Sequence, residues 1–117
     1  MRRLADIALT EFADIVLSTT VKTAKLRLHF TDGSYADIWF SRQRPGVYAY
    51  HWKRRHVDGA IFRHDNIPHQ RWKSVAAFPK HFHDGADEQV VDSNLPNDPE
   101  QALRLFLNFC REKVAEK

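Results

Sequence analysis

The sequence predicts an α+β domain, in which an antiparallel sheet of four to five strands is combined with an N-terminal helix and a C-terminal helix. In the middle of the chain, apolar and polar residues alternate in short segments separated by Asp-Gly and Pro-Gly turns, which is typical of strands. At the two ends, apolar residues recur at helical spacing. A chain of 117 residues has the usual size of one domain, so we expect residues 1–117 to fold as a single unit.

The N-terminal segment is expected to be an amphipathic helix that ends around Ser18. Its apolar positions are Leu4, Ile7, Ala8, Phe12, Ile15 and Val16. Residues 15–17 could instead begin a strand, because they form a short apolar run.

Four central segments are expected to form a meander of antiparallel strands. These segments are residues 23–30, 35–41, 47–53 and 60–65. Turns are predicted between them at Asp32-Gly33, Arg44-Pro45-Gly46 and Asp58-Gly59. Residues 66–97 show no clear period, although residues 89–91 could form a short strand. We expect the rest of this stretch to be a long loop, and such loops are often functional.

The C-terminal segment is expected to be a helix that Asp98 caps, with Pro99 at its first position and Gln101 at capping-box spacing. Its core stripe is Leu103, Phe106, Leu107, Cys110 and Val114. A second apolar stripe, formed by Ala102, Leu105 and Phe109, needs a cover as well. Either the N-terminal helix or a partner, such as a second copy in a homodimer, would supply it.

The overall composition favours a cytoplasmic protein. The only cysteine, Cys110, cannot form an internal disulfide, which indicates a reducing compartment. No apolar run is long enough to span a membrane, so we expect no membrane partner. The net charge of +3 and the isoelectric point near 9.2 fit a polyanionic partner such as RNA.

Histidines are concentrated between residues 51 and 83, which hold six of the seven. Histidine changes its protonation state near neutral pH, so such a cluster suits proton transfer or metal binding. His51 falls on the opposite strand face from Tyr48, Tyr50 and Trp52, and it could simply be a solvated strand residue. The candidate catalytic residues are His51, Arg63, Asp65, His69, His81, His83 and Tyr50.

Arg63 and Asp65 share one face of a predicted strand, where they could position a phosphate or form an ordinary surface salt bridge. His81 and His83 could be two metal ligands, with His69 or Asp65 as a third. A His-x-His pair often occurs by chance, so we expect no metal and no other cofactor.

Two basic segments contain or adjoin aromatic residues, a combination that suits the phosphates and bases of a single-stranded nucleic acid. One is the tip of the hairpin between the third and fourth predicted strands, and the other lies in the long loop. The candidate RNA-binding residues are Lys53, Arg54, Arg55, Arg71, Trp72 and Lys73. A solvated turn is the alternative for the hairpin tip.

Three blocks of the sequence resemble the TumE family of toxins. They are residues 48–52, 61–69 and 78–83, within a likeness that runs from about Asp32 to the terminal helix. The second block, with Arg63, Asp65-Asn66 and Pro68-His69, is the most specific. Where family members often carry two further histidines, this chain has Gln70 and Lys80.

The resemblance implies a growth-inhibiting toxin of a bacterial toxin–antitoxin system, kept in check by a cognate antitoxin. From the small size, the basic charge and the cluster of His, Arg, Asp and Tyr, we infer a ribonuclease that needs no metal. Two alternatives are a non-catalytic module that binds RNA or protein, and a metal-dependent hydrolase with a histidine site.

Overall fold

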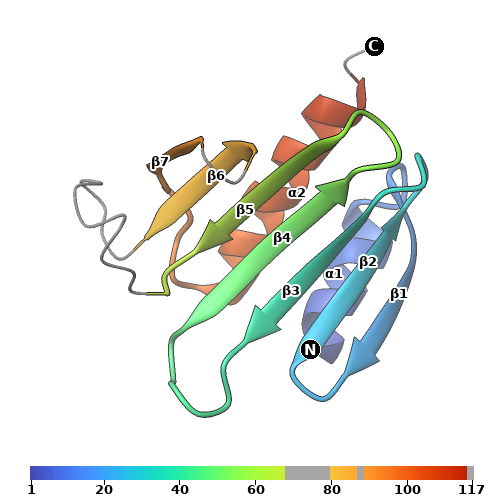
Figure 1. The fold of residues 1–117 in the computed structure, drawn as a ribbon. Helices are drawn as coiled ribbons and strands as arrows, with labels where there is room; N and C mark the ends of the chain where they lie inside the picture. Colours follow the sequence, from blue (N-terminus) through green and yellow to red (C-terminus); the bar gives the residue numbers. More distant parts are fainter. Residues whose placement is uncertain (68–79, 87–88, 116–117) are drawn as a thin grey trace.

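The computed structural model describes residues 1–67, 80–86 and 89–115 of the chain. Within these ranges the chain forms two helices and seven strands (Figure 1). In chain order the elements are α1 (Arg2–Glu11), β1 (Val16–Lys22), β2 (Lys25–Phe30), β3 (Tyr35–Phe40), β4 (Tyr48–Arg54), β5 (Ala60–Asp65), β6 (His81–Gly85), β7 (Val90–Asp92) and α2 (Pro99–Ala115). No described helix is long and apolar enough to cross a membrane.

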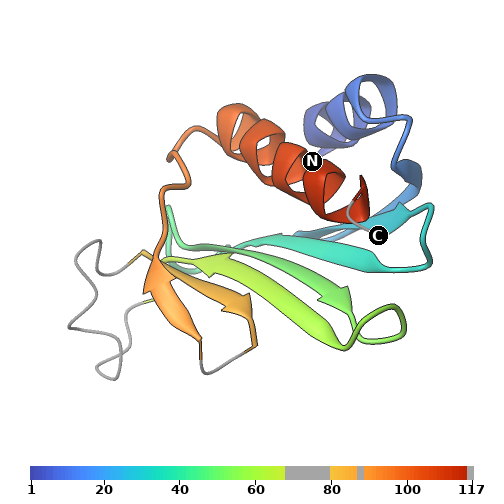
Figure 2. The same ribbon diagram turned by 90° about the horizontal axis from the view of Figure 1, so that it is seen from above.

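The seven strands form one sheet, in which each strand pairs antiparallel with the next strand along the chain. Both helices lie on the same side of this sheet, and no described helix covers the opposite face (Figure 2). The α+β class, the two terminal helices and the antiparallel meander are therefore confirmed. The sheet has more strands than the four to five that the sequence predicts.

The N-terminal helix is shorter than predicted, because it ends at Glu11 rather than around Ser18. Residues 16–22 form the edge strand β1 and pair with β2. This segment contains two threonines and two valines, and β-branched residues favour strands over helices. The alternative given for residues 15–17, that they begin a strand, is therefore correct.

Strand β6 lies in the stretch predicted to be a loop. This strand lacks the usual alternation of several apolar residues, because His81 and His83 are polar residues on one face and Phe82 is the main apolar residue on the other. The short strand expected at residues 89–91 is present as β7 at residues 90–92. Together β6 and β7 extend the predicted meander by two strands.

The core lies between the helices and one face of the sheet. Strand residues at alternate positions, such as Leu26, Ile38 and Trp52, are fully buried there against Leu103 and Phe106 of α2. The backbone N–H of Gln101 donates a hydrogen bond to the Asp98 carboxylate at 3.0 Å, so Asp98 caps α2 as predicted.

The second apolar stripe of α2 is not a continuous exposed surface. Ala102 is buried, and the Phe109 ring packs against Phe62 with ring centroids 5.0 Å apart. Leu105 remains partly exposed at 39%. Most of the second apolar stripe is therefore buried within the chain itself, and only Leu105 is left partly exposed to a partner.

Candidate active site

The strand register gathers polar side chains on the sheet face that no described helix covers. Asp37 on β3, His51 on β4, Arg63 on β5 and His83 on β6 are successive partners across four strands, so they form one row. The neighbouring row contains Ala49, Asp65 and His81. Five predicted catalytic residues from three different strands thus lie side by side, namely His51, Arg63, Asp65, His81 and His83.

Asp65 is the centre of contacts in this cluster. Its Oδ1 lies 2.9 Å from Nε2 of His81, and its Oδ2 lies 2.9 Å from Nε of Arg63. Nε2 of His83 lies 3.9 Å from the same Oδ2 atom. The Asp65 side chain is only 3% exposed, so this carboxylate acts at close range and with little screening by water. It can hold both His81 and Arg63 in place.

Arg63 is flanked by histidines on both neighbouring strands. His51 is its partner on β4 and His83 is its partner on β6, which places the Cα atoms of the two histidines about 10 Å apart. The His81 ring meets the His83 ring edge to face, with centroids 5.1 Å apart. The Arg63 side chain is 32% exposed, so its guanidinium remains accessible to a ligand.

Asp37 brings a second carboxylate beside His51. Arg27 donates two hydrogen bonds to it, at 2.7 and 2.9 Å. Burial alone would raise the pKa of Asp37, but the hydrogen bonds and charge of Arg27, aided by Lys25 and Lys53, hold this pKa below its ordinary value. Asp37 is therefore ionised at neutral pH.

Tyr50 does not join the cluster, because strand alternation points it toward the helices. It is 1% exposed and packs edge-on against Phe106, with ring centroids 5.6 Å apart. Burial, aided by neighbouring Tyr48 and Asp98, raises the pKa of its hydroxyl far above the ordinary value. The hydroxyl of Tyr50 is thus kept neutral in the core.

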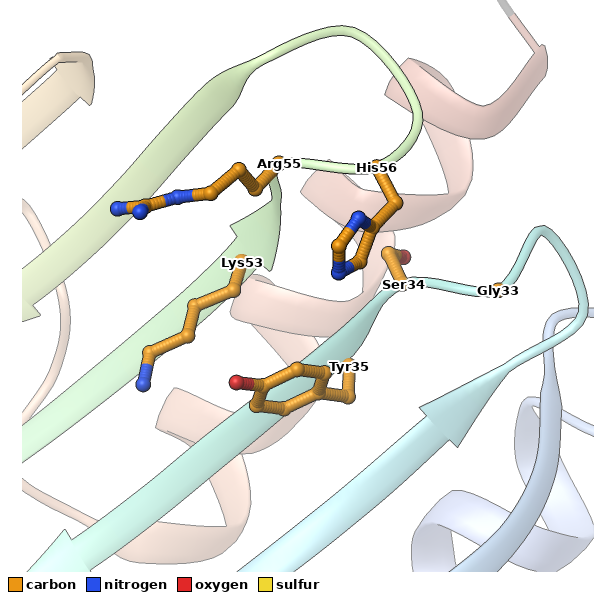
Figure 3. Close-up of a pocket in the computed structure, with 6 residues that line it drawn as sticks. All are labelled: Gly33, Ser34, Tyr35, Lys53, Arg55 and His56. Carbon is orange, nitrogen blue, oxygen red and sulfur yellow. The ribbon is translucent and has the colours of Figure 1, made fainter.

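Two of the basic residues predicted to bind RNA line a pocket of about 270 Å³ at the end of the β4–β5 hairpin. Figure 3 shows Lys53, Arg55 and His56 in this pocket together with Tyr35. Nζ of Lys53 lies 5.4 Å from the centre of the Tyr35 ring. The residues that line this pocket include three basic side chains and no acid, which suits an anion such as phosphate.

Arg54 points to the other side of the sheet. It is 6% exposed, and it forms ion pairs with Asp32 at 3.1 Å and with Asp58 at 2.9 Å while its guanidinium stacks over Trp52. The charge of Arg54 is thus neutralised by two carboxylates of the fold, and these ion pairs connect the two Asp-Gly turns. His69, Arg71, Trp72 and Lys73 lie outside the described residues.

Sequence reasoning missed Trp39, which is half-buried and lies with Asp37 and Ala49 in a pocket beside His51 and Arg63. The signal was present in the predicted strand 35–41, where Ala36, Ile38 and Phe40 form the apolar face. Trp39 falls on the other face, which is unusual for so large an aromatic residue.

A metal ion is one ligand that the cluster could hold. One ligand atom from each of Asp65, His81 and His83 can be chosen so that all three lie within 4.8 Å of one another. Two histidines and a carboxylate are a common ligand set for zinc and iron. Both carboxylate oxygens of Asp65 already contact His81 or Arg63, so a metal bound through Oδ2 would compete with the Arg63 guanidinium.

Comparison with known protein families gives a match over most of the chain. The family model described as Toxin TumE matches residues 4–114, which is nearly the whole chain. No curated protein and no solved structure matches the chain. The match covers most of both helices, all seven described strands and every residue of the cluster.

Proposed function

Because this chain belongs to the TumE toxin family, whose members are toxins of toxin–antitoxin systems, we propose that it inhibits growth by cleaving RNA without a metal. A cognate antitoxin follows from membership of the family. The cleavage reaction, its RNA substrate and a cytoplasmic site of action are our inference from the residues.

The observation that carries this proposal is the row in which Arg63 lies between His51 and His83. Cleavage of RNA by its own 2′-hydroxyl needs a base on one side of the phosphate and an acid on the other. A cation between them binds the phosphate and stabilises the charge that develops in the transition state. The order of His51, Arg63 and His83 in the row supports the assignment of these three roles.

The reaction transfers two protons and exchanges one phosphorus–oxygen bond for another. The 2′-oxygen attacks phosphorus while its proton passes to one histidine, and the bond to the 5′-oxygen breaks as the other histidine protonates that oxygen. The products are a 2′,3′-cyclic phosphate and a free 5′-hydroxyl. Asp65 is a positioning residue in this proposal, since it contacts both His81 and Arg63. His69 remains a candidate for the acid or base.

Purified protein incubated with cellular RNA in excess chelator tests this proposal. We expect cleavage to continue, and His51→Ala or His83→Ala to slow it by roughly 10²- to 10⁴-fold. His29→Ala is the matched control, because His29 lies on the same sheet face but on β2, outside the row. An RNA with a single deoxyribose at the cleaved position should resist cleavage there. RNA that stays intact with and without added metal would overturn the proposal.

A metal-dependent hydrolase is the second candidate, and the grouping of Asp65, His81 and His83 favours it. It predicts that chelator abolishes cleavage, that zinc or manganese restores it, and that the untagged protein retains one ion per chain on dialysis. Asp65→Asn and His83→Ala should lose the ion, whereas His29→Ala should keep it. Cleavage in chelator with no retained ion would exclude this candidate.

A further inference from the structure

The pocket beside the row of histidines has the chemistry of a nucleobase site. It has a volume of about 320 Å³, and it is lined by Asp37, Trp39, Ala49, His51, Arg63 and Ile67. This volume is near the lower end of the range of roughly 300 to 1,000 Å³ typical of small-molecule sites. Because Arg63 lines it, a group bound in the pocket would lie next to a phosphate held by that guanidinium.

Trp39 supplies the aromatic wall of this pocket. Among the described residues it contacts no other aromatic ring and no cation over its face. Trp52 is different, because it is fully buried on the opposite face of the sheet and packs against Phe30, Phe62 and Phe109. Core packing therefore accounts for the presence of Trp52. The Trp39 ring, in contrast, lines a pocket beside the candidate active site.

The residues next to Trp39 favour stacking as the mode of recognition. Its partner on β4 is Ala49, whose small side chain leaves room beside the indole, and its partner on β2 is Lys25. Both carboxylate oxygens of Asp37 already accept hydrogen bonds from Arg27. The pocket thus presents an aromatic face, a small apolar floor and a phosphate-binding cation, with its carboxylate already occupied.

We propose that Trp39 stacks on the base next to the cleaved phosphate, so that the substrate is single-stranded RNA read with little regard to base identity. The inference rests on the proposed RNA cleavage and adds the residue that binds the base. Stacking is possible only for an unpaired base, and every base offers a π-face, which explains both the preference for a single strand and the tolerance of sequence.

Binding of an uncleavable, 2′-O-methylated oligoribonucleotide, measured by fluorescence anisotropy, tests the inference. Trp39→Ala should weaken binding roughly tenfold or more, Trp39→Phe should restore most of it, and His29→Ala should leave it unchanged. With the wild-type protein, one abasic site in the oligonucleotide should weaken binding as much as Trp39→Ala does. Exchanging one base for another at that site should have little effect.

The outcomes separate this inference from the proposed function. If the wild-type protein cleaves RNA but neither Trp39→Ala nor the abasic site weakens binding, the stacking role is wrong and the ribonuclease stands. If the wild-type protein neither binds nor cleaves RNA, both are overturned. The abasic oligonucleotide requires no change to the protein, so the test does not depend on whether Trp39→Ala folds.

Discussion

Two buried histidines on opposite faces of the sheet have very different surroundings. His81 faces the polar cluster, where the Asp65 carboxylate contacts it. His64 faces the core, where it stacks on Phe82 and its Nδ1 lies 2.7 Å from Oγ of Ser93. The N–H of Leu95 donates a hydrogen bond to the same Oγ, so Ser93 can donate its hydroxyl hydrogen to a neutral His64. His64 is therefore adapted to the neutral state.

We predict that His64 makes the fold sensitive to acid. Burial lowers the pKa of His64 from 6.5 to about 4. The unfolded chain therefore binds the proton more readily, and stability present above pH 6.5 is lost as the pH falls toward 4, by roughly 3 kcal/mol. Urea unfolding measured across this range should show a smaller loss for His64→Gln than for wild type. Equal losses in the two proteins would contradict the prediction.

Tyr50 provides a second test, in which stability and activity respond differently. Its buried hydroxyl has no hydrogen-bond partner among the described residues. Tyr50→Phe removes this unsatisfied group, so it should raise the free energy of unfolding by about 1 kcal/mol and leave RNA cleavage unchanged. If the variant loses cleavage while it stays folded, Tyr50 belongs to the catalytic machinery after all.

Elements with an apolar period were predictable from the sequence, and elements without one were not. The alternation in β2 to β5 and the N-terminal cap of α2 predicted those elements closely. Strand β6 was missed, because its two buried residues on the uncovered sheet face, His81 and His83, belong to a polar cluster and not to the hydrophobic core. Most residues of the polar cluster are among those named from the sequence, but their arrangement depends on the register of β4, β5 and β6. Local patterns do not specify which residues become partners across strands.

The stripe on α2 shows how packing divides residues that the sequence treats alike. Phe109 packs against rings on β4, β5 and β6, whereas Leu105 is 39% exposed. We predict that Phe109→Ala lowers the free energy of unfolding by about 3 kcal/mol, and that Leu105→Ala changes it by less than about 1 kcal/mol. Chemical denaturation of both variants measures this. A large loss for Leu105 alone would contradict it, and a weaker complex with the antitoxin after Leu105→Asp would identify an interface.

The molecule as a whole has a helical side and a polar side. The two helices and the core occupy one face of the sheet, and the row with His51 and Arg63 and the basic pocket occupy the other. Side chains on the polar face do not pack in the main core. Their identity can therefore be determined by ligand binding and not by core packing. A substitution on the polar face should weaken RNA binding or cleavage more than it lowers the free energy of unfolding.

We predict that charge reversal at the basic pocket weakens RNA binding, whereas the same reversal on the helical side does not. Arg55 lines the pocket, and Arg2 is an exposed residue of α1. Arg55→Glu should reduce affinity and make it less sensitive to salt, because fewer counterions are released on binding. Arg2→Glu alters the net charge equally and is the matched control. Equal effects of the two variants would mean that only net charge matters.

The order of the strands also determines which parts of the fold can form first during synthesis. Each strand pairs with the one made just before it, so the sheet can grow as the chain emerges from the ribosome. Most of the apolar face of that sheet stays uncovered until α2, which follows all seven described strands, docks on it. Contacts such as the pair of hydrogen bonds from Arg104 to Glu11, 93 residues earlier, form only then. A nascent chain can therefore pair the strands of its candidate active site before its core is finished.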